Sequence, residues 1–235
     1  MPSAGYLDIA AIAPRIQGTR GADRGFIGGR SGSGKSYLAR TLLTSYGAKS
    51  EKEFRGSKFL IDPNHNFEFE SDEIWHRPSE VEIEPKKIKT YLYRPLPAFR
   101  EAEDWNEIFR KLFYTDNKLI TYIDETLALE TLFTQRRVPG GNYFTAYLTQ
   151  GRARGKAALM AAQRPVQIPR NVIGQAEWYY IFDLPLEDDR KYIAGTIGRY
   201  SDEGQDIADR KSLKRFEFWF KGPDTPDPMK LQVVK

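Results

Sequence analysis

The sequence predicts an α/β domain with a mostly parallel, doubly wound central sheet flanked by helices. Short apolar runs of strand length alternate with stretches of helix-forming residues along the chain. Most of these runs are apolar throughout, which is typical of strands covered on both faces. The 235 residues, 40% hydrophobic and 29% charged, suffice for a large core and exclude collagen-like and disordered proteins.

Seven apolar runs are expected to form the strands, and prolines, glycines or polar side chains end them. The last run alternates apolar and polar residues, so it is expected to be an edge strand, followed by an extended C-terminal tail. The expected strands cover residues 24–28, 57–62, 90–94, 118–124, 157–163, 178–184 and 216–220.

Helices are expected between these strands, over residues 35–46, 105–113 and 143–150. Asp104 and Glu107 resemble a capping box for the second helix, and Asn142 can cap the third. Residues 64–87 are acidic and irregular, and we interpret them as a surface excursion.

The chain has no internal repeat and no clear domain boundary. We therefore expect one domain over residues 1–235, with an N-terminal segment over 1–23, a core over 24–200 and a C-terminal strand and tail over 201–235.

The composition restricts the chemistry. The absence of cysteine excludes disulfides, iron–sulfur clusters and thiolate zinc sites, and two histidines are too few for a protein zinc cage. No stretch approaches the about 20 apolar residues that cross a bilayer, so a cytoplasmic protein without a membrane span is expected.

The net charge of +4 is distributed unevenly. Residues 131–176 contain no acidic side chain and carry +7, and the rest of the chain carries −3. This segment indicates a polyanion partner, although an acidic neighbouring subunit would also explain it. Its basic residues are Arg136, Arg137, Arg152, Arg154, Lys156, Arg164 and Arg170.

A phosphate-binding loop is the most specific motif. Residues 29–36, GRSGSGKS, fit G-x-x-x-x-G-K-[ST] completely and lie between an expected strand and an expected helix. Backbone N–H groups of such a loop bind phosphate, its lysine adds a cation, and its serine hydroxyl binds Mg²⁺. The predicted nucleotide-binding residues, for ATP with Mg²⁺, are Gly29, Arg30, Ser31, Gly32, Ser33, Gly34, Lys35, Ser36 and Tyr37.

Further polar residues at strand ends are catalytic candidates. Asp124, with Ser36, is expected to hold Mg²⁺, and Glu125 to polarise the attacking water. Gln163 can hydrogen-bond the γ-phosphate and the water, with a satisfied interior amide as the alternative. Arg152 and Arg154 could each act as an arginine finger, on their own site or a neighbour's, or contact DNA.

Five segments together resemble the HerA–FtsK superfamily of P-loop ATPases. They are the loop GRSGSGKS, then FLIDP followed by Asn64 and His65, then LITYIDE, LTQGRARGKAALMAAQRP and IPRNVIGQAEWYYIF. The resemblance covers most of the chain from Arg24 to about Arg190. The Asp-Pro, Gly-Arg and Gln-Arg-Pro elements discriminate better than the phosphate loop, which many families share.

The resemblance implies a RecA-like core that assembles into a ring, usually a hexamer, with ATP between subunits and double-stranded DNA in the pore. It implies that Asp124 and Glu125 form the Walker B pair, that Gln163 senses the γ-phosphate, and that Arg152 or Arg154 reaches the adjacent site. A bare ATPase domain is most similar to genome-packaging ATPases of icosahedral internal-membrane DNA viruses. Such an enzyme would act in the host cytoplasm, at a virion vertex, with capsid vertex proteins as partners.

DNA contacts are expected to be sequence-independent, and Arg136 and Arg137 beside Pro139-Gly140-Gly141 suit a pore loop. The acidic residues of 68–84 could dock on the arginines of the next subunit, or form a solvated face. Alternatives for the whole chain are another HerA–FtsK-type translocase or helicase, a zonula-occludens-toxin-like phage assembly ATPase acting on protein, and a small-molecule P-loop kinase.

Overall fold

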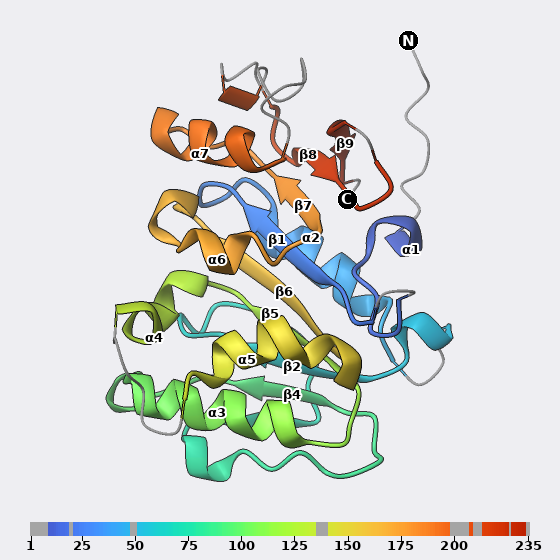
Figure 1. Cartoon of the computed structure of the whole chain (residues 1–235), viewed down its shortest axis with the longest axis vertical. Helices are drawn as coiled ribbons and strands as arrows, with labels where there is room; N and C mark the ends of the chain where they lie inside the picture. Colours follow the sequence, from blue (N-terminus) through green and yellow to red (C-terminus); the bar gives the residue numbers. More distant parts are fainter. Residues whose placement is uncertain are drawn as a thin grey trace.

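The computed structural model describes most of the chain, and its strands form a single sheet (Figure 1). The described residues are 9–18, 21–47, 51–134, 141–197, 207–208, 213–225 and 227–233. None of the helices in these ranges is long and apolar enough to cross a membrane.

The described strands form a nine-stranded sheet in the order β3-β4-β2-β5-β6-β1-β7-β8-β9. The seven strands from β3 to β7 in this order are parallel, and β8 and β9 are antiparallel. This confirms the mostly parallel α/β fold. The strands are β1 (Arg24–Gly28), β2 (Ser57–Ile61), β3 (Glu73–Trp75), β4 (Thr90–Tyr93), β5 (Leu119–Ile123), β6 (Lys156–Ala162), β7 (Trp178–Ile181), β8 (Glu217–Lys221) and β9 (Met229–Gln232).

Helices cover both faces of the sheet, so neighbouring residues of a central strand enter two different cores. Phe26 packs into the core on one face and Ile27 into the core on the other. Helices α3 (Ala102–Tyr114), α4 (Glu130–Thr134), α5 (Tyr143–Gln150), α6 (Arg170–Ile173) and α7 (Glu187–Ile197) lie on the first face (Figure 1). The second face carries α1 (Ile9–Ile12) and α2 (Lys35–Thr44).

Two expectations about the sheet were wrong. The segment 64–87 is not wholly irregular, because its residues 73–75 form β3, which pairs in parallel with β4. The strand near residues 216–220 is present as β8, but β9 covers its outer side, so β9 rather than β8 is the edge. Part of the tail therefore extends the sheet, because its backbone groups pair with β8.

The N-terminal cap of α3 also differs from the expectation. The helix begins at Ala102 with Glu101 as its N-cap, and the capping box pairs Glu101 with Asp104 rather than Asp104 with Glu107. The Asp104 carboxylate accepts from the Glu101 N–H at 3.2 Å, which places the first turn three residues earlier. The expected cap of α5 is confirmed, since Asn142 Oδ1 accepts from the Thr145 N–H at 2.9 Å.

Most of the acidic side chains of residues 68–84 have partners within the chain. Glu73 and Glu84 both form ion pairs with Lys89. The Asp72 carboxylate accepts from the Thr90 N–H at 2.7 Å, and Glu80 caps the turn at residues 78–80. These contacts favour a structural role over docking on a neighbouring subunit.

Candidate nucleotide-binding and catalytic site

The phosphate loop follows the buried strand β1 and ends where α2 begins. Gly34 is the N-cap of α2 and has a φ of 120°, a backbone conformation that favours glycine. A Cβ atom at this position would lie 2.8 Å from Cδ1 of Phe216. Local strain and this close approach therefore both require glycine at residue 34.

Lys35 occupies the centre of the loop. Its side chain is buried, and Nζ donates to the carbonyl oxygens of Gly29 at 2.6 Å and Arg30 at 3.0 Å. Burial lowers the pKa of Lys35, and the charges of Glu125 and Asp124 oppose this shift. The Lys35 side chain thus places a cation against the loop at the amino end of α2, where a polyphosphate is expected to bind.

Asp124 and Glu125 directly follow β5 and are half-buried. Burial raises the pKa of both carboxyl groups, and the Tyr122 hydroxyl opposes the shift of Asp124 by donating to its Oδ1 at 2.6 Å. Within the described part of the chain, Glu125 Oε1 is buried and has no hydrogen-bond partner. A carboxylate in this state can accept a proton or bind a water molecule.

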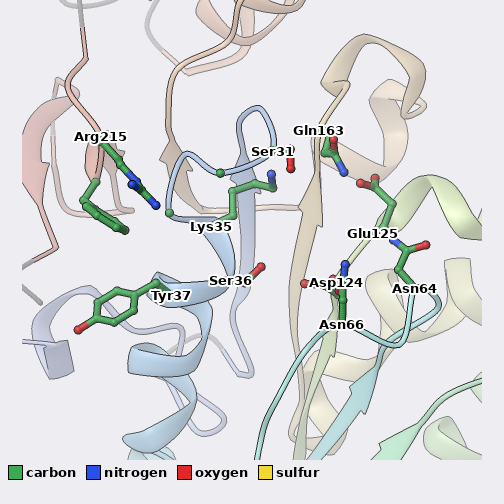
Figure 2. Close-up of a pocket in the computed structure, with 13 residues that line it drawn as sticks. Ser31, Lys35, Ser36, Tyr37, Asn64, Asn66, Asp124, Glu125, Gln163 and Arg215 are labelled. Atoms are coloured by element: carbon green, nitrogen blue, oxygen red, sulfur yellow. The ribbon is translucent and has the colours of Figure 1, made fainter.

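An open pocket of about 210 Å³ joins these groups. Parallel strands place their carboxyl ends at one edge of the sheet, and ligands bind there. Figure 2 shows Ser36 and Asp124 facing each other, with Glu125 and Gln163 beyond Lys35. The lining residues are Ser31, Gly32, Gly34, Lys35, Ser36, Tyr37, Asn64, Asn66, Asp124, Glu125, Gln163, Arg215 and Phe216.

Three of the predicted nucleotide-binding residues do not line the pocket. Gly29 and Ser33 are buried behind it. The Arg30 side chain forms an ion pair with Asp183 at 2.8 Å, and its N–H donates to the Asp183 carbonyl. Arg30 therefore anchors the loop to the residues after β7.

Gln163 follows β6 and is exposed, with its side chain at the pocket. This position contradicts the alternative of a satisfied interior amide. The next residue, Arg164, forms an ion pair at 2.8 Å with Asp189 of α7, whose side chain is completely buried. Asp189 also accepts from the Val166 N–H at 2.9 Å, so it fixes both sides of the turn after Gln163.

Arg152 and Arg154 lie at the opposite edge of the sheet. They belong to a turn of 3-10 helix, Gly151–Arg154, that precedes the amino end of β6, whereas Gln163 follows its carboxyl end. A seven-residue strand separates the two ends by about 20 Å. Neither arginine can therefore reach the pocket of its own chain.

The two arginines have different surroundings. Arg152 forms an ion pair with Glu177 at 2.6 Å. Arg154 is exposed, and its guanidinium lies 4.7 Å from the ring centroid of Phe113. Arg154 is thus more accessible to a neighbouring subunit than Arg152.

The basic segment 131–176 is less available to a polyanion than its sequence suggests. Lys156 is buried and donates to the carbonyl oxygens of Thr115 and Asn117, which end α3. Arg152 and Arg164 are ion-paired, as described above. The predicted DNA-contacting residues Arg136 and Arg137 lie outside the described residues.

The structure adds four lining residues that the sequence did not single out as site residues: Asn64, Asn66, Arg215 and Phe216. The two asparagines follow β2 closely, so the rule that ligands bind at carboxyl ends could have found them. Arg215 and Phe216 come from the segment before β8, and the Phe216 N–H donates to the Ser33 carbonyl at 3.1 Å. No local sequence signal predicts this contact across more than 180 residues.

The residues at the pocket fit a magnesium nucleotide. Among the described residues, no three His, Asp or Glu side chains gather into a metal cluster. Mg²⁺ does not need such a cage, because it usually takes one or two protein ligands and completes its shell with phosphate oxygens and water. The Ser36 hydroxyl and the Asp124 carboxylate provide two suitable ligands on facing sides of the pocket.

Comparison with known proteins gives related sequences and structures, although no protein-family model matches the chain. The DNA packaging ATPase P9 of Enterobacteria phage PRD1 is 27% identical over 170 residues, which are 72% of this chain and 67% of that protein. Two solved structures share the fold at lower identity.

The genome packaging NTPase B204 of Sulfolobus turreted icosahedral virus 2, in complex with AMPPCP, has a TM-score of 0.64 and 16% identity. The match covers 90% of this chain and 98% of that one. VirB4 of Thermoanaerobacter pseudethanolicus has a TM-score of 0.62 and 10% identity, over 90% and 89% of the two chains. The resemblance to genome-packaging ATPases is therefore confirmed in sequence by the phage protein, and the fold of this chain is that of viral genome-packaging NTPases and VirB4.

Proposed function

We propose that this chain is the ATPase of a genome-packaging motor, which hydrolyses ATP to move double-stranded DNA into a preformed capsid. One observation carries the proposal: residues from the carboxyl ends of three parallel strands, β2, β5 and β6, and from the phosphate loop after β1 line a single pocket. The named activities of the phage PRD1 and Sulfolobus virus relatives support the same function.

The pocket residues divide into groups that bind and groups that react. The loop N–H groups and Lys35 would bind the β- and γ-phosphates, and Ser36 and Asp124 would hold Mg²⁺, which neutralises developing charge. Glu125 would accept a proton from the attacking water, and burial, by raising its pKa, makes it a stronger base. Gln163 would contact the γ-phosphate, from a turn that Asp189 fixes.

A ring of subunits would complete the site. Because Arg152 and Arg154 lie at the edge opposite their own pocket, either can act as a finger only on an adjacent subunit. Arg154 is the better candidate, since it is exposed and makes no ion pair within the described residues. We propose a hexamer that encircles double-stranded DNA without reading its sequence, docks on capsid vertex proteins, and acts in the host cytoplasm during assembly.

Two other motors have similar sites. Another HerA–FtsK-type translocase or helicase would use the same pocket on DNA, and a zonula-occludens-toxin-like ATPase would use it on coat protein. A small-molecule kinase would need an acceptor site beside the γ-phosphate, and no segment of the sequence resembles an acceptor-binding lid.

The test is DNA-stimulated ATP hydrolysis by the purified full chain. We expect duplex DNA of unrelated sequences to raise the rate equally, and raising the salt concentration to abolish the stimulation. Lys35→Ala should abolish hydrolysis. Lys118→Ala is the matched control, because Lys118 lies away from the pocket and donates to Gln17. Hydrolysis that ignores duplex DNA would favour the protein-assembly alternative.

A further inference from the structure

The loop after β2 is held rigidly at the pocket. Asp62 is completely buried, forms an ion pair with Arg94 at 2.9 Å, and accepts from the N–H groups of Asn66 and Phe67 at 3.1 Å. Arg94 also donates to the Phe67 carbonyl at 3.0 Å. Residues 62–67 are therefore fixed from both ends.

A second arginine holds the outer side of this loop. Arg100 donates to the Pro63 carbonyl at 2.5 Å and to the Pro95 carbonyl at 3.2 Å. His65, with a φ of 57°, turns the backbone between Asn64 and Asn66, and its Nε2 lies 3.2 Å from the Pro95 oxygen. The positions of the two asparagines are thus set by groups other than their own side chains.

The asparagine side chains themselves are not used by the fold. Asn64 and Asn66 are exposed, and within the described part of the chain neither side-chain amide makes a hydrogen bond. Both line the pocket. In the view of Figure 2, Asn64 and Asn66 lie on the same side of the pocket as Asp124, Glu125 and Gln163, opposite the phosphate loop.

Glu125 supplies an independent observation at the same place. Its Oε1 atom is buried and has no hydrogen-bond partner among the described residues. A buried carboxylate oxygen without a partner is uncommon and indicates a water molecule or ligand as its partner. Asn64 and Gln163 are neutral amides that line the same pocket as Glu125.

We propose that Asn64 is a water-positioning residue: its amide, with that of Gln163, orients the attacking water against Glu125. The inference rests on the proposed ATPase function. The water oxygen forms a bond to the γ-phosphorus as the bond from that phosphorus to the bridging oxygen breaks and ADP leaves. One water proton passes to Glu125, and Asn64 Oδ1 accepts the hydrogen bond of the other.

An amide suits this place because it adds no charge. Asn offers an amide oxygen as an acceptor, so Oδ1 can accept a hydrogen bond from the water and hold it in place. A carboxylate there would repel both Glu125 and the phosphate. Positioning of this kind is worth large factors in rate, since an error of about 1 Å in a reacting group can cost about 10²-fold.

The test compares the full-length chain with Asn64→Ala, Asn64→Asp and the control Glu68→Ala. Glu68 is exposed in the same segment and lies outside this pocket. Steady-state ATP hydrolysis, binding of a non-hydrolysable ATP analogue, and binding of ADP with aluminium fluoride, which mimics the transition state, are measured for each. Thermal unfolding checks that each variant is folded.

We expect Asn64→Ala to lower kcat about 10²-fold and to weaken binding of the transition-state mimic about as much. Binding of the ATP analogue and the melting temperature should stay at wild-type values. Asn64→Asp should lower kcat at least as much as Asn64→Ala does. Glu68→Ala should have the kcat and ligand affinities of the wild type. The decisive result is that Asn64→Ala weakens binding of the transition-state mimic but not of the ATP analogue. If Asn64 had only a structural role, its replacement would weaken binding of both.

The inference is overturned if Asn64→Ala retains kcat within about threefold of the wild type. Equal weakening of both ligands would also overturn it, because Asn64 would then hold the nucleotide rather than the water. An inactive wild type that binds nucleotide would instead refute the proposed function itself. The two failures are therefore distinguishable in the same set of measurements.

Discussion

Replacement of Asp189 tests whether α7 fixes the turn that carries Gln163. The Asp189 side chain is completely buried and accepts two hydrogen bonds, from Arg164 Nε and the Val166 N–H. A hydrogen bond to a charged group contributes about 1.5–3 kcal/mol, and a buried group left unpaired costs about 1–3 kcal/mol. We use the low end for Arg164, because its side chain is 42% exposed and water can replace the carboxylate.

Asp189→Ala should therefore lower the free energy of unfolding by about 3 kcal/mol, or the melting temperature by about 6–12 °C for a chain of this size. It should also lower kcat at least about 10-fold at unchanged KM, because the turn after Gln163 loosens. Asp189→Asn keeps an acceptor for the Val166 N–H. Its stability and kcat should therefore lie between those of the wild type and those of Asp189→Ala. Urea unfolding and steady-state ATP hydrolysis measure these effects.

Asp188→Ala is the matched control for this experiment. It removes the same charge from the same turn of α7, but Asp188 is exposed and makes no hydrogen bond within the described residues. Only the favourable interaction with the helix dipole is lost, about 0.3–1 kcal/mol. Equal effects of the two replacements, on stability or on kcat, would refute the role given to Asp189.

Three further predictions concern the pocket and the ring. Glu125→Gln should keep nucleotide binding but lower kcat about 10²–10⁴-fold. Because burial raises the pKa of Glu125, wild-type kcat should fall as the pH drops through that raised value, and a pH profile that breaks only at an ordinary glutamate pKa would contradict this. Arg215→Ala should raise KM for ATP about 10-fold with kcat nearly unchanged, as the guanidinium lines the pocket; an unchanged KM would remove Arg215 from the site. Arg154→Ala should abolish hydrolysis without loss of stability. Arg152→Ala should lower the free energy of unfolding by about 1 kcal/mol, because the ion pair with Glu177 is lost. Mixing Arg154→Ala with Lys35→Ala subunits should restore some activity, and its absence at every ratio would argue against a finger acting between subunits.

Local patterns explain why much of the fold was predictable. Strands such as β5 and β6 are apolar throughout because both of their faces are buried, and this leaves a continuous run in the sequence. The phosphate loop and the Asp124-Glu125 pair each adjoin such a strand, so their place at its carboxyl end follows directly.

The parts that escaped prediction depend on long-range contacts. β3 has only three residues and gains its order by pairing with β4, while its own segment is acidic. α7 buries Asp189, which makes its apolar stripe weak, and the contacts with Arg164 and the Val166 N–H explain that burial. Arg215 reaches the pocket through a contact between Phe216 and Ser33, which no sequence window contains.

The charged groups around the pocket are arranged in two different ways. Asp62 and Asp189 are completely buried, and each pairs with an arginine and accepts backbone N–H groups from a loop that leads to the pocket. A buried ion pair adds little net stability, because desolvation offsets much of the attraction. Asp62 and Asp189 each bind one of the two loops that carry Asn64 and Gln163. We therefore infer that these aspartates fix the conformation of the loops rather than add stability.

Asp124 and Glu125 are not paired with an arginine within the described residues, although the Tyr122 hydroxyl donates to Asp124 and the backbone N–H groups of Leu127 and Gln163 interact with Glu125. Neither forms an ion pair, and burial raises the pKa of both. A carboxylate locked to an arginine is a poor base, because the cation stabilises its charged form, whereas an unpaired buried carboxylate gains from taking up a proton or sharing a metal ion. The fold thus pairs the aspartates that position the loops and leaves unpaired the acids proposed to react, and this contrast separates supporting from reacting carboxylates in the same pocket.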